Sequence, residues 1–340
     1  MRNRPSRFIG GSFQTRNFFD PTSEEPHCAI ERQRFGKTAA GYGIAEERYM
    51  KMHMQTQTST VVRDSTNKWL ATLTNGAYTV TSAGPKRTFS EPTVANPVTH
   101  SVWVRSLPMP FDGNIDMTWL TRALEANQLA VPDVLAIAMQ YVAGAPATFE
   151  GDLQIAGDAS YGPPKNGKRE EGSDFSDYLG IEWVYPEGVD KPEKRQLHCV
   201  DCSGFIRMVW GYRHHLPGYG YVDTVPLCLK PRQSHDAIPR RAFEIYEAAP
   251  GVVVVSDVGI QVKDFSSVRI GDLLFFDADP GDGTRIDHVG MYLGLDAGNH
   301  HRFISSRKGA NGPTLGDYKG KSLLDGTGLY AKSFRAVNRL

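Results

Sequence analysis

Short stretches of alternating hydrophobic and polar residues dominate the chain between residues 56 and 110. The alternation predicts strands at residues 58–63, 69–73, 77–81 and 100–105, separated by turn residues. Asn75-Gly76 lies between the second and third strands, and an Asn-Gly pair flanked by strands is a strong hairpin signal. We therefore expect a small β-rich domain over residues 56–110.

The residues before this domain show no sustained hydrophobic period. Residues 1–55 are rich in arginine, glycine and polar side chains, so we expect an irregular N-terminal arm with a short helix around residues 45–54.

From residue 111 on, hydrophobic positions recur at helical spacing. They predict helices over residues 116–127 and from Pro132 to Val142, where proline suits a first helical turn. Residues 145–197 interrupt this pattern and are rich in Gly, Asp, Lys and Pro. So long a loop is unusual in a compact domain, so it is either a flap over a binding cleft or a disordered surface loop. A flap would make its apolar contacts through Tyr178, Trp183 and Tyr185.

The run from Asp201 to Trp210 predicts a helix with a cysteine in its first turn. Asp201 is a suitable N-cap, and Gly204 leaves room for a substrate backbone to come close. A thiol at a helix N-terminus lies in a positive field that favours the thiolate. We expect Cys202 to be a solvent-facing nucleophile; the alternative is a buried, unreactive cysteine.

Two further apolar runs, residues 269–276 and 287–294, predict a hairpin, because a Gly- and Asp-rich turn joins them. In the second run His288 lies on the face opposite Val289. If the face of His288 carries the helix that begins at Cys202, the imidazole can meet the thiol. A base of near-neutral pKa beside a thiol is the arrangement of nucleophilic cysteine catalysis.

Weaker periodic stretches lie between the cysteine and the histidine. Residues 240–248 predict a helix, and residues 251–255 and 260–262 predict short strands.

Composition narrows the class of protein. The 340 residues, 40% of them hydrophobic, suffice for a sizeable core. Because 38 Lys and Arg balance 38 Asp and Glu, we do not expect a nucleic-acid partner. No apolar run is long enough for a membrane span, and the N-terminus lacks the apolar segment of a signal peptide. Non-classical export, association with a particle and a cytoplasmic location all stay open.

The cysteines and histidines also allow other chemistries. Four cysteines are too few and too unevenly spread for a disulfide scaffold. A zinc site would need ligands from His198, Cys199, Cys202, His214, His215 and Cys228. A second Cys-x-x-Cys pair is absent, so we expect no metal and no cofactor. The Cys199–Cys202 spacing permits a redox disulfide, but we favour a Cys199 that points into the core.

Taken together, three blocks resemble, in order, the NlpC family of bacterial papain-like cysteine peptidases, which cut peptide stems of the cell wall. The matching blocks are residues 201–205, 271–276 and 288–294. Residues 141–144 also resemble the family's Tyr-Val-x-Gly segment, so the resemblance covers about residues 130–310. Two departures are the insertion at residues 145–197 and a serine, Ser305, where the family usually has a histidine.

The resemblance implies an α+β fold for residues 111–340, a papain-like peptidase domain with helices packed on an antiparallel sheet. It makes Cys202 the nucleophile and His288 the base. Ser305 becomes the third member of the triad, with His301 and His300 as rivals of the residue type that the family prefers.

Further roles also come from the resemblance. Tyr141 and the backbone N–H of Cys202 would stabilise the oxyanion, and Asp201 and Ser203 would recognise the end of the peptide. The implied reaction is hydrolysis of an amide in peptidoglycan stem peptides, often the bond from D-glutamate to the diamino acid. Two alternatives remain: an amidase or acyltransferase acting outside the wall, and an idle wall-binding or assembly protein. The intact Cys202 and His288 weigh against the idle protein.

Overall fold

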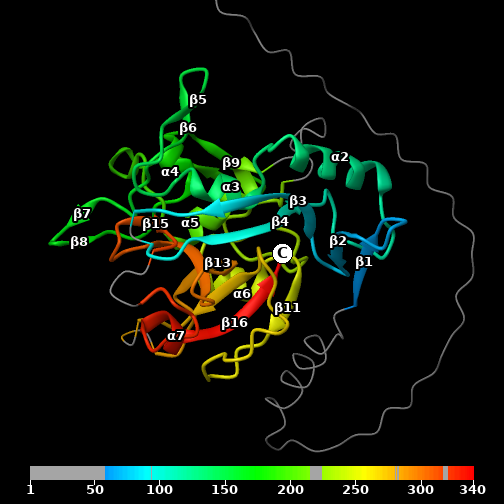
Figure 1. Ribbon diagram of the computed structural model, residues 1–340. Coiled ribbons are helices and arrows are strands. Elements are labelled where there is room, and N and C mark those ends of the chain that lie inside the picture. Colours follow the sequence, from blue (N-terminus) through cyan, green and yellow to red (C-terminus); the bar gives the residue numbers. More distant parts are fainter. Residues whose placement is uncertain (1–57, 93, 215–223, 280, 282, 317–320) are drawn as a thin grey trace, which may run out of the picture. The chain divides into compact units, whose positions relative to one another are not determined.

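The computed structural model describes residues 58–340 apart from 93, 215–223, 280, 282 and 317–320 (Figure 1). By its contacts the chain divides into Met1–Met50 and Lys51–Leu340, and every described residue belongs to the second unit. The predicted arm and its short helix lie outside the described residues.

A four-stranded antiparallel sheet forms the N-terminal β-rich region, with its strands in chain order. The strands are β1 (Ser59–Arg63), β2 (Trp69–Thr74), β3 (Thr79–Phe89) and β4 (Val98–Ser106). Gly76 takes a φ of 82° in the turn between β2 and β3, a conformation that glycine adopts without strain. The four predicted strands are therefore confirmed, and β3 is longer than its alternating pattern indicated.

Two helices follow the sheet. Helix α2 (Met117–Gln128) begins after Asp116, whose side chain accepts hydrogen bonds from two backbone N–H groups of the first turn, and its Trp119 and Leu120 pack against the sheet. Helix α3 (Val134–Met139) is shorter than predicted. The reason is that the backbone tightens at its end, where the Tyr141 N–H bonds to the Ala138 carbonyl.

The second sheet has six strands, and its paired neighbours are all antiparallel. Its strands, in spatial order, are β11 (Val252–Val255), β16 (Phe334–Arg339), β12 (Leu273–Phe276), β13 (His288–Leu295), β14 (His301–Arg307) and β15 (Gly312–Thr314). The predicted hairpin is confirmed, since Phe276 pairs with His288. The predicted strand at residues 260–262 is wrong, because only the Val262 N–H reaches a neighbouring strand, at the Phe334 carbonyl.

Different hydrophobic layers cover the two faces of this sheet. On one face, Val289 packs with Phe205 of helix α5 (Cys202–Ile206) in the largest core cluster, which also includes helix α6 (Ala242–Ala248). On the other face, Phe276 packs in a separate cluster that includes residues flanking helix α7 (Leu329–Ser333). The structure is thus a mixed helix and sheet arrangement, as predicted.

The segment at residues 145–197 is folded. It contains β5 (Thr148–Glu150), β6 (Leu153–Ala156), β7 (Pro164–Lys165), β8 (Lys168–Arg169), α4 (Phe175–Leu179), β9 (Trp183–Tyr185), β10 (Gly188–Asp190) and η1 (Lys194–Gln196). Tyr178 and Tyr185 are buried in the main core, and Trp183 packs edge-on against Phe175. These aromatic residues therefore stabilise the core and do not form the cleft contacts that a flap requires.

A buried ion pair ties this segment to the helix that carries the cysteine. Both carboxylate oxygens of Asp174, the N-cap of α4, accept hydrogen bonds from the Arg207 Nε, at 3.1 and 3.0 Å. Arg207 opens the π-helical segment η2 (Arg207–Arg213), which continues α5, and it is completely buried. The Nη1 of Arg207 donates to the Cys228 and Ile238 carbonyls at 2.8 and 2.6 Å, and its Nη2 donates to the Tyr185 hydroxyl. This arginine is the meeting point of three chain segments.

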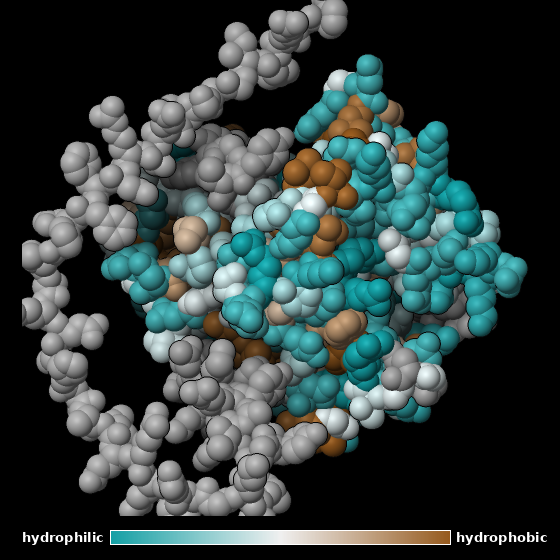
Figure 2. Space-filling view, turned by 180° about the vertical axis from the view of Figure 1, so that it is seen from behind, coloured by the Kyte–Doolittle hydropathy of each residue, from teal (hydrophilic) through white to brown (hydrophobic). Residues whose placement is uncertain are grey.

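The face shown in Figure 2 is mainly hydrophilic, with hydrophobic residues in small separate patches. None of the helices in the described part of the chain has the length and apolar character to cross a membrane.

The Asp174–Arg207 pair gives a stability test. Asp174→Asn should lower the free energy of unfolding by about 3–5 kcal/mol, because it leaves a buried guanidinium without its counter-charge. The matched control is Glu182→Gln, which removes an exposed ion pair with Lys191 and should cost less than about 1 kcal/mol. Urea denaturation measures both. Equal losses in the two variants would contradict a structural role for the insertion.

Candidate active site

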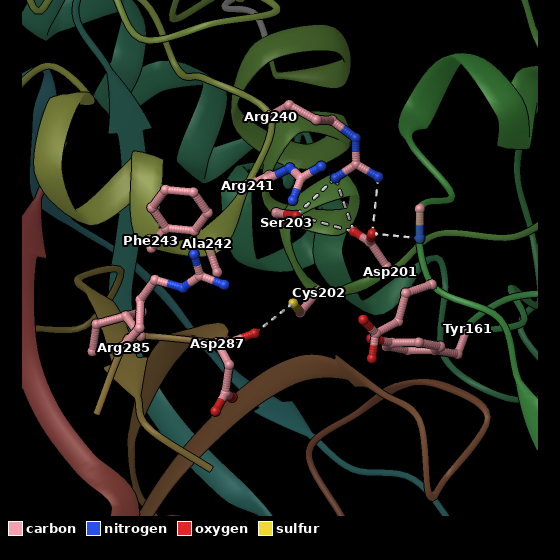
Figure 3. Close-up of a pocket in the computed structure, with 13 residues that line it drawn as sticks. Tyr161, Asp201, Cys202, Ser203, Arg240, Arg241, Ala242, Phe243, Arg285 and Asp287 are labelled. Carbon is pink, nitrogen blue, oxygen red and sulfur yellow. Dashed lines mark hydrogen bonds and ion pairs between the residues drawn. The ribbon is translucent and has the colours of Figure 1, made fainter. Parts of the chain in front are cut away.

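A cavity of about 470 Å³ lies at the N-terminus of α5 (Figure 3). Four chain segments far apart in the sequence line it: the insertion, through Tyr161, Glu171 and Gly172; the cysteine block, through residues 201–203; residues 240–243; and residues 285–287. The segment just before β13 thus forms the wall beside the thiol.

Cys202 lines this cavity and is only 6% exposed. The Cys202 Sγ lies 3.9 Å from the Asp287 carbonyl oxygen. The Val289 N–H also donates to this sulfur. The prediction of a solvent-facing thiol is therefore wrong. Burial, followed by the negative charge of Asp201, raises the thiol pKa to about 12, so the resting thiol is protonated. Helix α5 has only five residues, and its N-cap is an anion, so the expected stabilisation of the thiolate fails.

His288 is the first residue of β13, between the two residues whose backbone groups contact the sulfur. The hydrophobic face of α5 packs against Val289, not against the sheet face of His288, so the arrangement expected from strand alternation is wrong. The backbone contacts of Asp287 and Val289 with Cys202 place the cysteine at the start of β13, where His288 lies.

The imidazole of His288 is held by a serine. Its Nε2 lies 3.0 Å from the Ser305 Oγ, and its ring packs beside those of Phe276 and Tyr330. Burial, followed by the charge of Arg307, lowers the His288 pKa to about 3. The resting imidazole is therefore neutral near pH 7.

Arg307 also fixes the hydroxyl of Ser305, because its Nε donates to the Oγ at 2.9 Å. A serine oxygen can accept two hydrogen bonds. If it accepts from both Arg307 and His288, the imidazole proton lies on Nε2 and Nδ1 is left as a proton acceptor. The structure brings Ser305, and not its rivals, to His288.

The two rival histidines have other partners. The His301 Nδ1 pairs with the Tyr292 hydroxyl at 2.5 Å, and its ring stacks on Phe265. The His300 Nδ1 lies 3.1 Å from Asp325. Both side chains are thus directed to residues other than His288.

Tyr141 lies away from the cavity. It is fully buried, donates to the Ile155 carbonyl at 2.7 Å and accepts from Arg213 at 2.8 Å. Tyr161, which the sequence did not single out, lines the cavity instead. Burial raises the pKa of Tyr161, so the phenol remains protonated and is a hydrogen-bond donor. Only a Tyr-Gly-Pro-Pro run marked this position in the sequence, and that pattern indicates a turn.

The carboxylate of Asp201 is surrounded by donors. Its Oδ1 caps α5 through the Gly204 N–H at 2.8 Å, as predicted, and also accepts from the Ser203 hydroxyl. Arg240, a second residue that sequence analysis missed, donates to both oxygens, at 3.2 and 2.8 Å, and donates to the Ser203 Oγ at 2.8 Å (Figure 3). The Gly172 N–H completes the set at 3.2 Å. Five donors thus reach about four lone-pair positions, which leaves little capacity for the end of a peptide.

Gly204 serves packing against the insertion. A Cβ at this position would lie 2.4 Å from the Ser173 carbonyl oxygen. The group that approaches Gly204 closely is therefore the backbone of the protein itself and not a substrate. The space that we expected a substrate to need is filled by the inserted segment.

The other described cysteines do not take part in the cavity. Cys199, Cys202 and Cys228 are all free, and the Cys199 thiol points to the Leu197 carbonyl at 3.7 Å. Cys199 is buried, as we favoured. Within residues 58–340, apart from the gaps, no group of three potential ligands is placed to hold a metal. Cys28 and His215 lie outside the described residues.

Comparison with known proteins identifies the class of the cysteine and histidine blocks. Residues 187–312 match the model of the NlpC/P60 family, which confirms the resemblance for this part of the chain. Proteins of this family are generally cysteine peptidases or amidases of the cell wall. The match contains Cys202, His288 and Ser305 but not the segment that begins at Tyr141. A search of curated proteins found no match to the chain.

The neutral state of His288 predicts how stability depends on pH. With a pKa lowered to about 3 in the folded protein, His288 stays neutral where an unfolded histidine takes up a proton. Its contribution to stability is therefore full above pH 6.5 and is lost as the pH falls towards 3, by at most about 1.4 kcal/mol per pH unit. His288→Gln should lose less stability than the parent between pH 7 and pH 4.5. Urea midpoints at the two pH values measure this, and parallel losses would contradict it.

Proposed function

We propose that this protein is a cysteine peptidase that hydrolyses amide bonds in the stem peptides of peptidoglycan. The observation that carries the proposal is the placement of Cys202 against the start of β13, with His288 bound to Ser305 at 3.0 Å. The family match over residues 187–312 supports the cell wall as the source of the substrate.

The proposed reaction starts from a neutral thiol and a neutral imidazole. As the Cys202 sulfur attacks the amide carbonyl, His288 takes the thiol proton on Nδ1. The backbone N–H of Cys202 and the hydroxyl of Tyr161 are the proposed donors to the oxyanion. The C–N bond then breaks, and His288 gives its proton to the departing amine. Water, activated by the same imidazole, hydrolyses the thioester and releases the acid.

The proposed role of Ser305 is to position the imidazole. A serine hydroxyl is uncharged, so it orients the ring without stabilising the imidazolium as a carboxylate would. Arg307 behind it opposes a positive imidazole. We therefore propose that the proton resides on His288 only briefly during the reaction.

The arrangement also supports a papain-like fold for this part of the chain. Helix α5 begins at the nucleophile and packs on an antiparallel sheet, and His288 and Ser305 come from the adjacent strands β13 and β14. The N-terminal sheet would then be an addition to this unit. Its boundaries at residues 56 and 110 stay a prediction.

The nucleophile is tested by Cys202→Ala. Hydrolysis of stem peptides should fall by several orders of magnitude, because the members of a catalytic triad act as a unit. Mass analysis of purified peptidoglycan and of free stem peptides after incubation measures the products. Because Cys202 is buried, circular dichroism must first show that the variant is folded.

Cys199→Ala is the matched control, since it removes a buried thiol three residues away that does not line the cavity. It should retain activity near that of the parent. A Cys202→Ala variant that keeps a tenth of the parent's activity would exclude a thiol nucleophile. Cleavage of amides from other sources, with none from wall peptides, would favour the non-wall amidase.

The third member of the triad is tested by comparing Ser305→Ala with His301→Ala. Ser305→Ala should lower kcat by about tenfold, the value of one orienting hydrogen bond, with little change in KM. It should also alter the pH profile, since the hydroxyl holds the imidazole that titrates. His301→Ala should leave kcat nearly unchanged, because its ring contacts Tyr292 and Phe265. Equal, mild effects would mean that His288 acts in a dyad.

A further inference from the structure

Helix α7 brings an aromatic side chain to His288 from outside the region that the family model matches. The match ends at residue 312, before α7 begins. The ring of Tyr330 on α7 lies 5.2 Å from the His288 ring, centre to centre, with an angle of 35° between the two planes. Tyr330 also meets Phe303 and Phe276 edge-on, at 5.2 and 5.3 Å. Two phenylalanines therefore fix the tyrosine ring that packs against the imidazole.

The same tyrosine contacts the arginine behind Ser305. The Arg307 guanidinium lies 4.9 Å from the centre of the Tyr330 ring and 4.2 Å from that of Phe303. The negative face of an aromatic ring attracts a guanidinium, so both rings stabilise the charge of Arg307 at this position. The Arg307 Nη1 also donates to the Ser322 hydroxyl at 2.5 Å, a second contact with the segment that leads to α7. Tyr330 thus contacts both the imidazole and the arginine that binds its serine partner.

We propose that Tyr330 is a positioning residue of the active site, which holds the His288 imidazole in the plane of its bond to Ser305 and shields it from water. This inference rests on the proposed function, because it assigns Tyr330 to the base of the peptidase. Ser305 offers an uncharged hydrogen bond, which is weaker than a bond to a carboxylate. It also holds only one edge of the imidazole. A larger share of the constraint on the ring must therefore come from packing.

The surroundings of His288 predict how loss of the Tyr330 ring changes the titration of the imidazole. The elements that meet at His288 carry these ionisable side chains: Arg307 on β14, Tyr330 on α7, Cys202 on α5, and Asp287 just before β13. Burial is the main cause of the low His288 pKa, ahead of the charge of Arg307. A smaller side chain at position 330 admits water to the imidazole, so the His288 pKa should rise towards its ordinary value.

The test compares Tyr330→Leu with Tyr330→Phe. With free stem peptides, Tyr330→Leu should lower kcat by roughly tenfold to a hundredfold and leave KM nearly unchanged, because a displaced base loses its place beside the reacting atoms. Tyr330→Phe keeps the ring and should retain most of the parent's kcat. Should Tyr330→Leu not fold, Tyr330→Met gives the same test, since it fills more of the space without a ring.

Nuclear magnetic resonance of histidine-labelled protein follows the imidazole directly. The His288 signal is assigned by its loss in His288→Gln. In the parent and in Tyr330→Phe it should stay that of a neutral ring down to pH 4.5, because the pKa is about 3. In Tyr330→Leu it should titrate between about pH 4.5 and pH 6.5.

Phe265→Leu is the matched control. Phe265 and Tyr330 are both partly buried and pack against the same hydrophobic cluster, but Phe265 stacks on His301 and not on His288. The control should lose stability as Tyr330→Leu does, yet keep the parent's kcat and His288 titration. Equal kcat in the two leucine variants, an unchanged His288 titration in Tyr330→Leu, or a Tyr330→Phe as impaired as Tyr330→Leu would each overturn the positioning role.

The two measurements separate this inference from the proposed function. Cleavage that depends on Cys202 but is as fast in Tyr330→Leu as in Phe265→Leu overturns the role of Tyr330 and leaves the peptidase. A parent without Cys202-dependent cleavage overturns the peptidase. The His288 titration needs no substrate, so it then still decides whether Tyr330 shields the imidazole.

Discussion

A buried row of alternating charges holds the cavity together. Arg207 binds Asp174, Arg240 lies 3.6 Å from the same carboxylate, and Arg240 binds Asp201 beside the thiol. Each charge is shielded from water, so each is stable in the core only while its neighbour is present. Because these four residues come from the insertion, the cysteine helix and the loop before α6, their pairing fixes three segments at once.

Burial explains why the Cys202 thiol and the His288 imidazole are both neutral at rest. The site is built into the core, where burial penalises an isolated thiolate or imidazolium. Arg240 offsets part of the negative field of Asp201 at the thiol, and Arg307 adds a positive field at His288. In the proposed reaction, a proton transfer from Cys202 to His288 would create two opposite charges, which attract one another more strongly in the core than in water.

The insertion has a double role in this arrangement. Its helix α4 supplies the buried Asp174, and its loops supply Tyr161 and the Gly172 N–H to the cavity. Gly204 of the cysteine helix is needed because the Ser173 backbone approaches so closely. The wall on the side of Asp201 is thereby closed by the inserted segment.

The sequence by itself determined what depends on neighbours along the chain. The four strands of the first sheet, strand β11, the β12–β13 hairpin and the cap that Asp201 gives to α5 follow from local patterns. The order of the blocks carries the family resemblance, and this resemblance singled out Cys202, His288 and Ser305. What only the tertiary structure decided depends on side chains far apart in the sequence. Only the tertiary structure shows that Tyr161, and not Tyr141, lines the cavity with the thiol. It also shows that Arg240 binds Asp201 and that Cys202 is buried and protonated. Local periodicity cannot encode them, because burial and ion pairing are set by which distant segments meet in the core.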